Sequence, residues 1–333
     1  MIGPNGVPGE FRTVPCPLCG SAEHIIVHRD LSDLLLRHPG TFAIRECRNC
    51  QMQYLDPQPV GATLAAYYAP VGDAAYPDNR ERPAKELKPL LRWALHHLRG
   101  YPAPTETSRP LAHRLRAKGA LAKANDRYRY LPYVGDGRLL DVGCGSGEYV
   151  RTMGQLGWKA EGLSMVESEA SRFASATDTQ IHQGNIRDLP LSKRFDAITL
   201  WHVLEHLPDP KADIEHLRQI LAPGGTLGVA IPVMDSAEAQ LLGTAWMGYE
   251  VPRHLLFFTR KRLQKFLGDS GFDVLGMHSE PRTRSIEMSL PRSNVDWVTR
   301  MLLGRKWILR TTVRHWTRMN LNGMVVAWAR RRD

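Results

Sequence analysis

Four cysteines form the most chemically specific pattern in the chain. They fall as two pairs with two residues inside each pair: Cys16 with Cys19 and Cys47 with Cys50. Two such pairs joined by a short insertion are typical of tetrahedral zinc sites, whereas disulfides or a redox pair suit a cytoplasmic chain less well. Four thiolates leave no coordination position open, so we expect a structural Zn²⁺. Segment 20–46 must then fold back as a hairpin.

A glycine-rich loop, DVGCGSG at 141–147, is the second segment with chemical potential. It joins a predicted strand to a predicted helix, so a ligand can approach its backbone closely and meet free N–H groups at the helix start. Glu148 breaks the strict dinucleotide-binding spacing of G-x-G-x-x-G. We therefore expect a ligand other than a dinucleotide at this loop.

Histidines gather in two later segments, WHVLEH at 201–206 and EVPRHLLFF at 250–258. His202 and His206 are four residues apart, but a zinc-protease motif would need a Glu directly after the first His. A neutral imidazole can accept a proton near pH 7, and the guanidinium of Arg253 can bind phosphate or carboxylate with two hydrogen bonds. Each of these side chains could equally be a buried residue with a structural hydrogen bond or ion pair.

Alternating strands and helices must position these residues. Strands separated by helices of about 10–15 residues predict an α/β fold with a doubly wound, mainly parallel sheet. We expect strands at 138–142, 159–163, 195–200, 226–231, 271–275 and 321–328, and helices at 87–98, 110–130, 147–156, 168–175, 210–221 and 260–268. The predicted domains are a zinc-ribbon-like module (12–56), a basic, proline-interrupted helical linker (57–137), an α/β core (138–281) and a basic C-terminal segment with a final strand (282–333).

The net charge of +10 over 333 residues is concentrated in two segments. Residues 80–138 carry +9 and residues 282–332 carry +10, while 139–281 carry −5. Such clustering suggests an anionic partner, such as a phosphorylated substrate, a membrane surface or nucleic acid, and two solvated basic helical stretches are an equal alternative. No apolar run could cross a bilayer, and the first residues resemble no signal peptide, so we expect a cytoplasmic protein without a transmembrane segment.

The glycine loop and the elements after it resemble the class I S-adenosylmethionine (SAM)-dependent methyltransferases over about 138–280. The segment HVLEH resembles that of small-molecule methyltransferases, and PRHLLFF resembles that of bacterial methyltransferases that also carry an N-terminal Cys₄ module. Some sugar C-methyltransferases have a comparable two-knuckle plan, with Glu-His where this chain has Arg253 and His254. The resemblance implies a Rossmann-like methyltransferase fold. It also implies SAM contacts from Asp141, Gly143, Gly145, Gly147, Ser164, Asn185, Ile186, Trp201 and His202. Ser164 stands where the family usually has an acid for the ribose hydroxyls.

By the same resemblance, His254 and His202 are candidate catalytic bases, and Tyr249, Arg253 and His206 are candidate substrate contacts. The predicted function is SAM-dependent methylation of a small or carrier-linked, anionic acceptor of the nucleotide-sugar or glycan type. A nucleic-acid methyltransferase and a non-catalytic binding module on the same fold are the alternatives. Trp297, Trp307 and Trp316 lie among arginines in the basic C-terminal segment, which is compatible either with an amphipathic surface helix pair in peripheral contact with a membrane or with a lid packed on the site.

Overall fold

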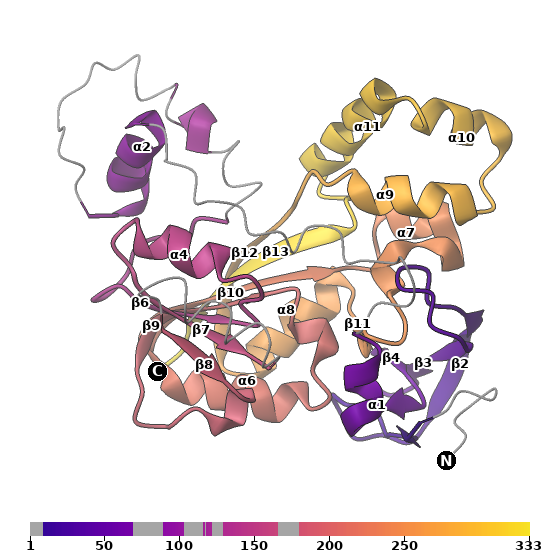
Figure 1. Cartoon of the computed structure of the whole chain (residues 1–333), viewed down its shortest axis with the longest axis horizontal. Coiled ribbons are helices and arrows are strands. Elements are labelled where there is room, and N and C mark those ends of the chain that lie inside the picture. Colours follow the sequence, from indigo (N-terminus) through magenta and orange to yellow (C-terminus); the bar gives the residue numbers. More distant parts are fainter. Residues whose placement is uncertain (1–8, 69–88, 103–115, 117, 122–128, 166–179) are drawn as a thin grey trace.

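The structure is a computed structural model of the chain, and it describes residues 9–68, 89–102, 116, 118–121, 129–165 and 180–333. A seven-stranded sheet forms its centre, in the order β12-β13-β10-β9-β6-β7-β8 (Figure 1). Only β13 runs antiparallel to its neighbours β10 and β12; every other pairing in this sheet is parallel. The predicted α/β fold with a mainly parallel sheet is confirmed. The strands are β6 (Arg138–Val142), β7 (Lys159–Ser164), β8 (Ile181–Gln183), β9 (Phe195–Trp201), β10 (Leu221–Pro232), β12 (Phe272–Ser279) and β13 (Met324–Arg331).

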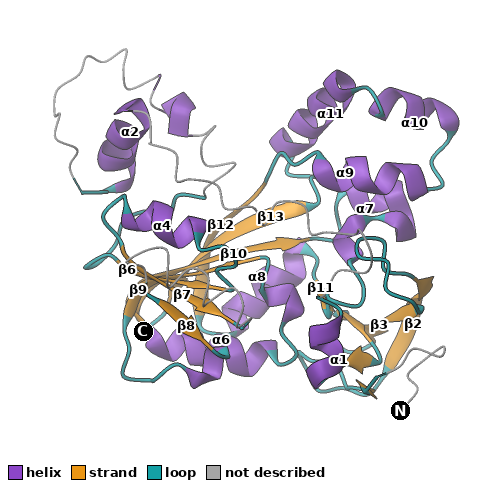
Figure 2. Cartoon of the chain, viewed as in Figure 1, coloured by secondary structure: helices purple, strands orange, loops and turns teal. Residues whose placement is uncertain are grey.

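The central strands β6 and β9 are largely apolar because the sheet is covered on both faces. Six of the seven residues of β9 are buried, and helices α4 on one side and α6 and α8 on the other flank the sheet (Figure 2). Asp209 and Thr259 cap α6 and α8 by accepting hydrogen bonds from Ala212 and Arg262 backbone N–H groups. The bounds of these helices are α4 (Glu148–Gly154), α6 (Pro210–Ile220) and α8 (Arg260–Asp269).

The N-terminal module is a separate four-stranded antiparallel sheet in the order β11-β4-β3-β2. The segment between the cysteine pairs folds back as the predicted hairpin of β2 and β3. Its outer strand β11 comes from the region after β10, so the module is completed by the core and does not end at residue 56. The bounds are β2 (His24–Leu31), β3 (Phe42–Cys47), β4 (Gln53–Leu55) and β11 (Leu256–Phe257), beside a small pair of β1 (Phe11–Arg12) and β5 (Gln58–Pro59).

One hydrophobic core runs through both sheets. It includes Ile44 and Tyr54 of the module together with Leu200 of β9 and Phe258 after β11, all essentially buried. A second cluster forms where α2 (Pro89–Arg99) packs with Tyr130 and Trp158 beside β6 and α4. Module and core therefore share apolar packing, which fixes the loops between them.

Several predicted elements extend further than the sequence indicated. β10 begins at Leu221, which pairs with Phe195 of β9, and β12 continues to Ser279 because it pairs along β13. The helix predicted at 168–175 and most of that at 110–130 lie outside the described residues.

Between β12 and β13 the chain forms a helical lobe of α9 (Arg284–Ser289), α10 (Trp297–Leu303) and α11 (Lys306–Arg318), which lies with α7 (Ala237–Leu242) beyond one end of the sheet (Figure 1). The remaining elements are α1 (Gly61–Ala66) and the short 3₁₀ turns Ile186–Asp188, Leu204–His206, Gly243–Ala245, Met247–Tyr249 and Leu290–Arg292. Among the helices that the structure describes, none is long and apolar enough to cross a bilayer.

Candidate functional site

The four predicted cysteine ligands converge in the N-terminal module. Their sulfur atoms all lie within 4.8 Å of one another, and the Sγ atoms of Cys16 and Cys50, and of Cys19 and Cys47, are 3.5 Å apart. A tetrahedral ion with bonds of about 2.3 Å to sulfur separates its ligands by roughly 3.8 Å, so the cluster has the size that zinc requires. The geometry is compatible with Zn²⁺ bound by the four thiolates.

Each knuckle closes with a residue in the left-handed region. Gly20 and Gln51, at φ +75° and +59°, donate backbone N–H hydrogen bonds to the carbonyls of Cys16 and Cys47. The tight turn after the second cysteine is thus made by glycine in the first knuckle and by glutamine in the second. These turns aim both thiolates of each pair toward the same point.

The glycine loop lies at the carboxyl edge of the sheet, directly after β6. Gly143, Gly145 and Gly147 all have positive φ values between 49° and 66°. A Cβ atom at Gly143 would come within 2.5 Å of Val203, whereas one at Gly145 would meet no atom within 4 Å. The loop therefore presents open space at Gly145, and a ligand can approach its backbone there.

Asp141 precedes this loop and is buried at the end of β6. Its carboxylate accepts a hydrogen bond of 2.6 Å from the Thr199 hydroxyl, and burial raises its pKa to about 7. Ser164 ends the neighbouring strand β7 and is also buried. Asn185 is exposed and exchanges hydrogen bonds with Asp188, while Ile186 beside it is buried. All four line the edge where the resemblance implies the cofactor.

His202 follows β9 with a φ of +61° and is already engaged by an arginine. Its Nε2 lies 3.0 Å from the guanidinium of Arg129, which can only donate, so this nitrogen is the acceptor. Arg129 also pairs with Glu280 through two hydrogen bonds of 2.8 Å and stacks over Trp201 at 5.0 Å. Because Arg129 occupies the lone pair of His202, this arrangement does not favour His202 as a base.

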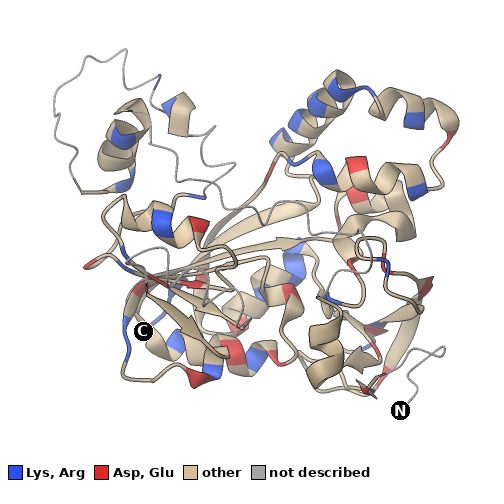
Figure 3. Cartoon of the chain, in the orientation of Figure 1, with Lys and Arg blue, Asp and Glu red and all other residues tan. Residues whose placement is uncertain are grey.

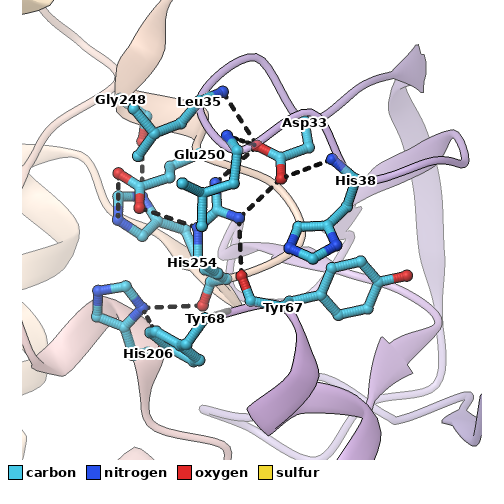
Figure 4. A network of polar contacts seen from close by, with 11 residues as sticks. Asp33, Leu35, His38, Tyr67, Tyr68, His206, Gly248, Glu250 and His254 are labelled. Carbon is cyan, nitrogen blue, oxygen red and sulfur yellow. Dashed lines mark hydrogen bonds and ion pairs between the residues drawn. The ribbon is translucent and has the colours of Figure 1, made fainter. Parts of the chain in front are cut away.

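Arg253 is placed differently from the sequence-based expectation of an anion contact. Its side chain is fully buried and forms two hydrogen bonds, of 2.7 and 2.8 Å, with Asp33 of the N-terminal module (Figure 4). Glu250 and the carbonyl of Tyr67 accept further hydrogen bonds from it. The guanidinium therefore makes its hydrogen bonds inside the protein, where it joins module and core. It presents no donor to an acceptor molecule.

Tyr249 also belongs to this junction and not to an open substrate surface. The residue is 6 % exposed, and its hydroxyl lies 2.9 Å from Nε2 of His28 on β2. Together with the pairing of β11 and β4 and the ion pair of Arg253 with Asp33, this contact ties the 246–259 loop to the N-terminal module. The module therefore shapes the segment that carries His254.

His206 and His254 come together beside this junction. Their rings stack edge to face with centroids 4.7 Å apart. Nδ1 of His206 lies 2.9 Å from the carbonyl of Arg253, and Nδ1 of His254 lies 2.8 Å from the carbonyl of Gly248 (Figure 4). A carbonyl only accepts, so Nδ1 of each ring carries the proton and each Nε2 keeps a lone pair.

Burial keeps both imidazoles neutral. It lowers the pKa of His254 below its ordinary value and lowers that of His206 to about 3, with the neighbouring His254 adding to the effect on His206. The nearest carboxylate to His254 is Glu250, with an oxygen 3.8 Å from Nε2. Both rings are therefore neutral near pH 7, and the lone pair on each Nε2 can accept a hydrogen bond or bind a ligand.

Glu205 gives this pair a possible third member. It is fully buried, neither of its oxygens makes a hydrogen bond, and burial raises its pKa to about 8. Ligand atoms of Glu205, His206 and His254 all lie within 4.8 Å of one another, so these three could hold a divalent cation. The described residues thus contain two clusters of potential metal ligands, one of thiolates and one of imidazoles with a carboxylate.

Comparison with protein families identifies the α/β core. Residues 103–276, more than half of the chain, match a family described as a methyltransferase domain. The chain belongs to this methyltransferase family. Membership implies SAM as the methyl donor.

The methyltransferase is also similar to several named proteins. It is 28% identical to the ubiquinone biosynthesis O-methyltransferase of Psychrobacter arcticus over 184 residues, 48% of this chain and 68% of the relative. The protein of the same name from Xanthomonas oryzae is 32% identical over 177 residues, 48% of this chain and 74% of the relative. A SAM-dependent methyltransferase structure from Mesorhizobium loti matches 60% of this chain and 94% of its own with 20% identity and a TM-score of 0.42.

The open glycine loop of the methyltransferase fits a bound SAM. The space at Gly145, the positive φ values of the loop and the position of Ser164 at the end of the adjacent strand suit a ligand lying along this edge. Asn185 and Ile186 follow at the end of β8, and Trp201 and His202 at the end of β9. These residues remain the predicted SAM contacts.

Several side chains at the site escaped the sequence analysis. Glu205 and Glu250 stand inside the quoted histidine segments but look there like ordinary surface acids. Asp33, Arg129 and Tyr68 carry no motif at all, and Tyr68 places its hydroxyl 3.0 Å from Nδ1 of His206. Only tertiary contacts over long sequence separations reveal them.

Proposed function

We propose that the protein transfers a methyl group from SAM to a hydroxyl oxygen of a small or carrier-linked acceptor, with His254 as the general base. The observation that carries this proposal is the buried His206–His254 pair. The Nδ1–H group of each ring is held by a backbone carbonyl, and each Nε2 keeps its lone pair. A hydroxyl must lose its proton as it is methylated, and a neutral, oriented imidazole is suited to take it.

SAM supplies an activated methyl group on a sulfonium, so the protein has to align the acceptor and manage one proton. The acceptor oxygen bonds to the methyl carbon while the carbon–sulfur bond breaks and its electron pair stays on sulfur. The hydroxyl proton passes to Nε2 of His254. The Gly248 carbonyl, which accepts the hydrogen bond from Nδ1–H, then stabilises the resulting imidazolium, and Glu250 lies close enough to add favourable charge.

Oxygen as the methylated atom is supported by the relatives, whose names describe O-methyltransferases. The anionic, nucleotide-sugar or glycan type of acceptor is a further proposal, and Arg253 no longer contributes to it. Its remaining support is the concentration of positive charge in 80–138 and 282–332. A comparison of phosphorylated and neutral acceptors of the same ring type tests this part separately.

The test of the base is His254→Asn. The asparagine amide can still donate to the Gly248 carbonyl in place of Nδ1–H, but the lone pair of Nε2 is gone. We expect kcat to fall by about 10²–10⁴, while the dissociation constant for SAM, measured by isothermal titration, stays unchanged.

His24→Asn is the matched control, because Nδ1 of His24 also lies 2.8 Å from a carbonyl, that of Ala22, far from the site. Its kcat should equal that of the parent. A His254→Asn enzyme with full kcat would exclude His254 as the base. For the donor site, Gly145→Arg should abolish SAM binding by filling the open space, and Gly224→Arg, which is equally open with positive φ, should not.

A further inference from the structure

The helical lobe between β12 and β13 exposes an unusual amount of apolar surface. Trp297 is 74 % exposed and Trp307 is 67 % exposed, although tryptophan is normally among the most buried residues on average. Val298, Met301 and Leu302 on α10 are exposed as well, and only Leu303 of this helix is buried. Such a cluster of apolar side chains marks an interaction surface.

Helix α11 adds a stripe of positive charge to the same lobe. Lys306, Arg310, Arg314 and Arg318 follow one another at intervals of four residues and are all exposed. Figure 3 shows basic positions recurring along this helix. At 3.6 residues per turn, Trp307 falls within the arc that these cations occupy. The face of α11 beside this arc, with Leu309 and Val313, is buried in the protein.

This charge pattern calls for an anionic partner. Like charges four residues apart repel each other and destabilise a helix, and only two acidic residues lie in 282–332 to offset its twelve basic ones. A second copy of the chain would bring the same positive stripe to the contact, which argues against self-association through this face. Nucleic acid would satisfy the cations but would not bury aliphatic side chains such as Val298, Met301 and Leu302.

We propose that α10 and α11 form a docking surface for an anionic phospholipid bilayer, lying in the plane of the headgroups. Trp297 and Trp307 insert at the headgroup level, where tryptophan is favoured, with Met301 and Leu302 reaching toward the acyl chains. The cations of α11 contact the lipid phosphates. The surface belongs to a lobe outside the glycine loop and the histidine pair, so the inference does not depend on the proposed reaction.

The experiment is sedimentation of the full-length, zinc-loaded protein with vesicles. We expect it to partition onto vesicles of equal parts phosphatidylglycerol and phosphatidylcholine and to remain in solution with phosphatidylcholine alone. Raising the salt from about 0.1 M to about 1 M should release it, because the screening length falls from about 10 Å to 3 Å. Acyl chains brominated near the headgroup should quench the tryptophan fluorescence of the parent, and quench it less in Trp297→Phe.

Two sets of variants separate the contributions. Trp297→Ala with Trp307→Ala removes the apolar anchors, and Arg310→Gln with Arg314→Gln should lower the partition coefficient about fivefold for each charge removed. Leu275→Ala and Lys261→Gln are matched controls, since both residues are exposed but lie on β12 and α8. The controls should bind as the parent does. All of these side chains are exposed, so circular dichroism and zinc content should stay constant.

Absence of binding to anionic vesicles, or equal binding by test and control variants, would overturn the proposal. A concentration-dependent dimer that the tryptophan variants abolish, without any vesicle binding, would assign the face to a second copy instead. Loss of binding in both variant sets with binding retained in both controls would establish the surface.

Discussion

The two clusters of ligand-type side chains in this protein arise in opposite ways. The thiolate cluster is assembled by two local turns, each of which brings together cysteines three positions apart in the chain. The histidine cluster draws His206 from the end of β9 and His254 from the loop after β10, and that loop is held by the N-terminal module. The spacing of the cysteines in the sequence predicts the first cluster, whereas the second forms only when the loop after β10 packs against the N-terminal module.

The way in which the histidine cluster forms shows what the N-terminal module contributes to the enzyme. Its sheet is completed by β11, its Asp33 neutralises the buried Arg253, and its His28 meets Tyr249. All three contacts act on the segment that carries His254. The four-cysteine module is thereby coupled to the proposed base through packing and one buried ion pair.

Zinc removal should have the largest effect, because structural zinc contributes about 10–16 kcal/mol in isolated zinc-finger peptides. We expect a strong chelator to release one zinc per chain, unfold the module and lower both the melting temperature and kcat. Elemental analysis and circular dichroism measure these changes. Cys144→Ser, outside the cluster, should retain one zinc. Two zinc ions per chain would instead indicate that the histidine cluster holds the second.

Asp33→Ala breaks the link between the two clusters while leaving the thiolates in place. Removing one partner of a buried ion pair strands the other charge, so we expect a loss of about 3–5 kcal/mol in the free energy of unfolding. The measured zinc content should stay at one, and kcat should fall because the 246–259 loop loses its anchor.

Asp30→Ala is the control for Asp33→Ala, since Asp30 is an exposed residue of β2, three positions before Asp33. Replacing both partners, Asp33→Leu with Arg253→Met, should recover much of the stability because no charge is then left buried. A stable, fully active Asp33→Ala enzyme would contradict the coupling.

The smallest effect is expected from mild acid. Burial disfavours the imidazolium form and lowers the pKa of His254 below its ordinary value of 6.5. The neutral base therefore persists as the pH falls, and kcat should decline only below about pH 6.5. A pH–rate profile, with zinc content followed in parallel because protonated thiolates release zinc, measures this. An acid limb centred above that value would show that another group limits the reaction.

Much of the fold follows from local patterns in the sequence. The strands 138–142 and 195–200 appear as β6 and β9 with almost the predicted bounds, because continuous apolar runs must be buried on both faces. Strand ends were harder to place. β10 starts before its apolar run because Leu221 pairs with β9, and β12 extends beyond its run because β13 offers backbone partners as far as Ser279.

In the candidate site, too, the parts built from neighbours in the chain were predicted better than the parts that depend on distant contacts. Cysteine spacing and the glycine loop were predicted correctly in position, since each is built from neighbours in the chain. The role of Arg253 was not. A lone arginine beside a histidine looks the same whether it meets a ligand or an internal acid, and its partner Asp33 lies 220 residues away.

The sequence by itself therefore determined the α/β class, the methyltransferase core and the thiolate cluster, because periodicity, glycine placement and cysteine spacing are local properties. Tertiary structure alone decided which side chains are buried and which face solvent. It placed Arg253 in an internal ion pair and left the cations of α11 exposed. In the sequence, the residue type alone does not distinguish these two cases. The physical reason is that desolvation and charge pairing depend on neighbours in space, and those are set by how the sheets and loops pack.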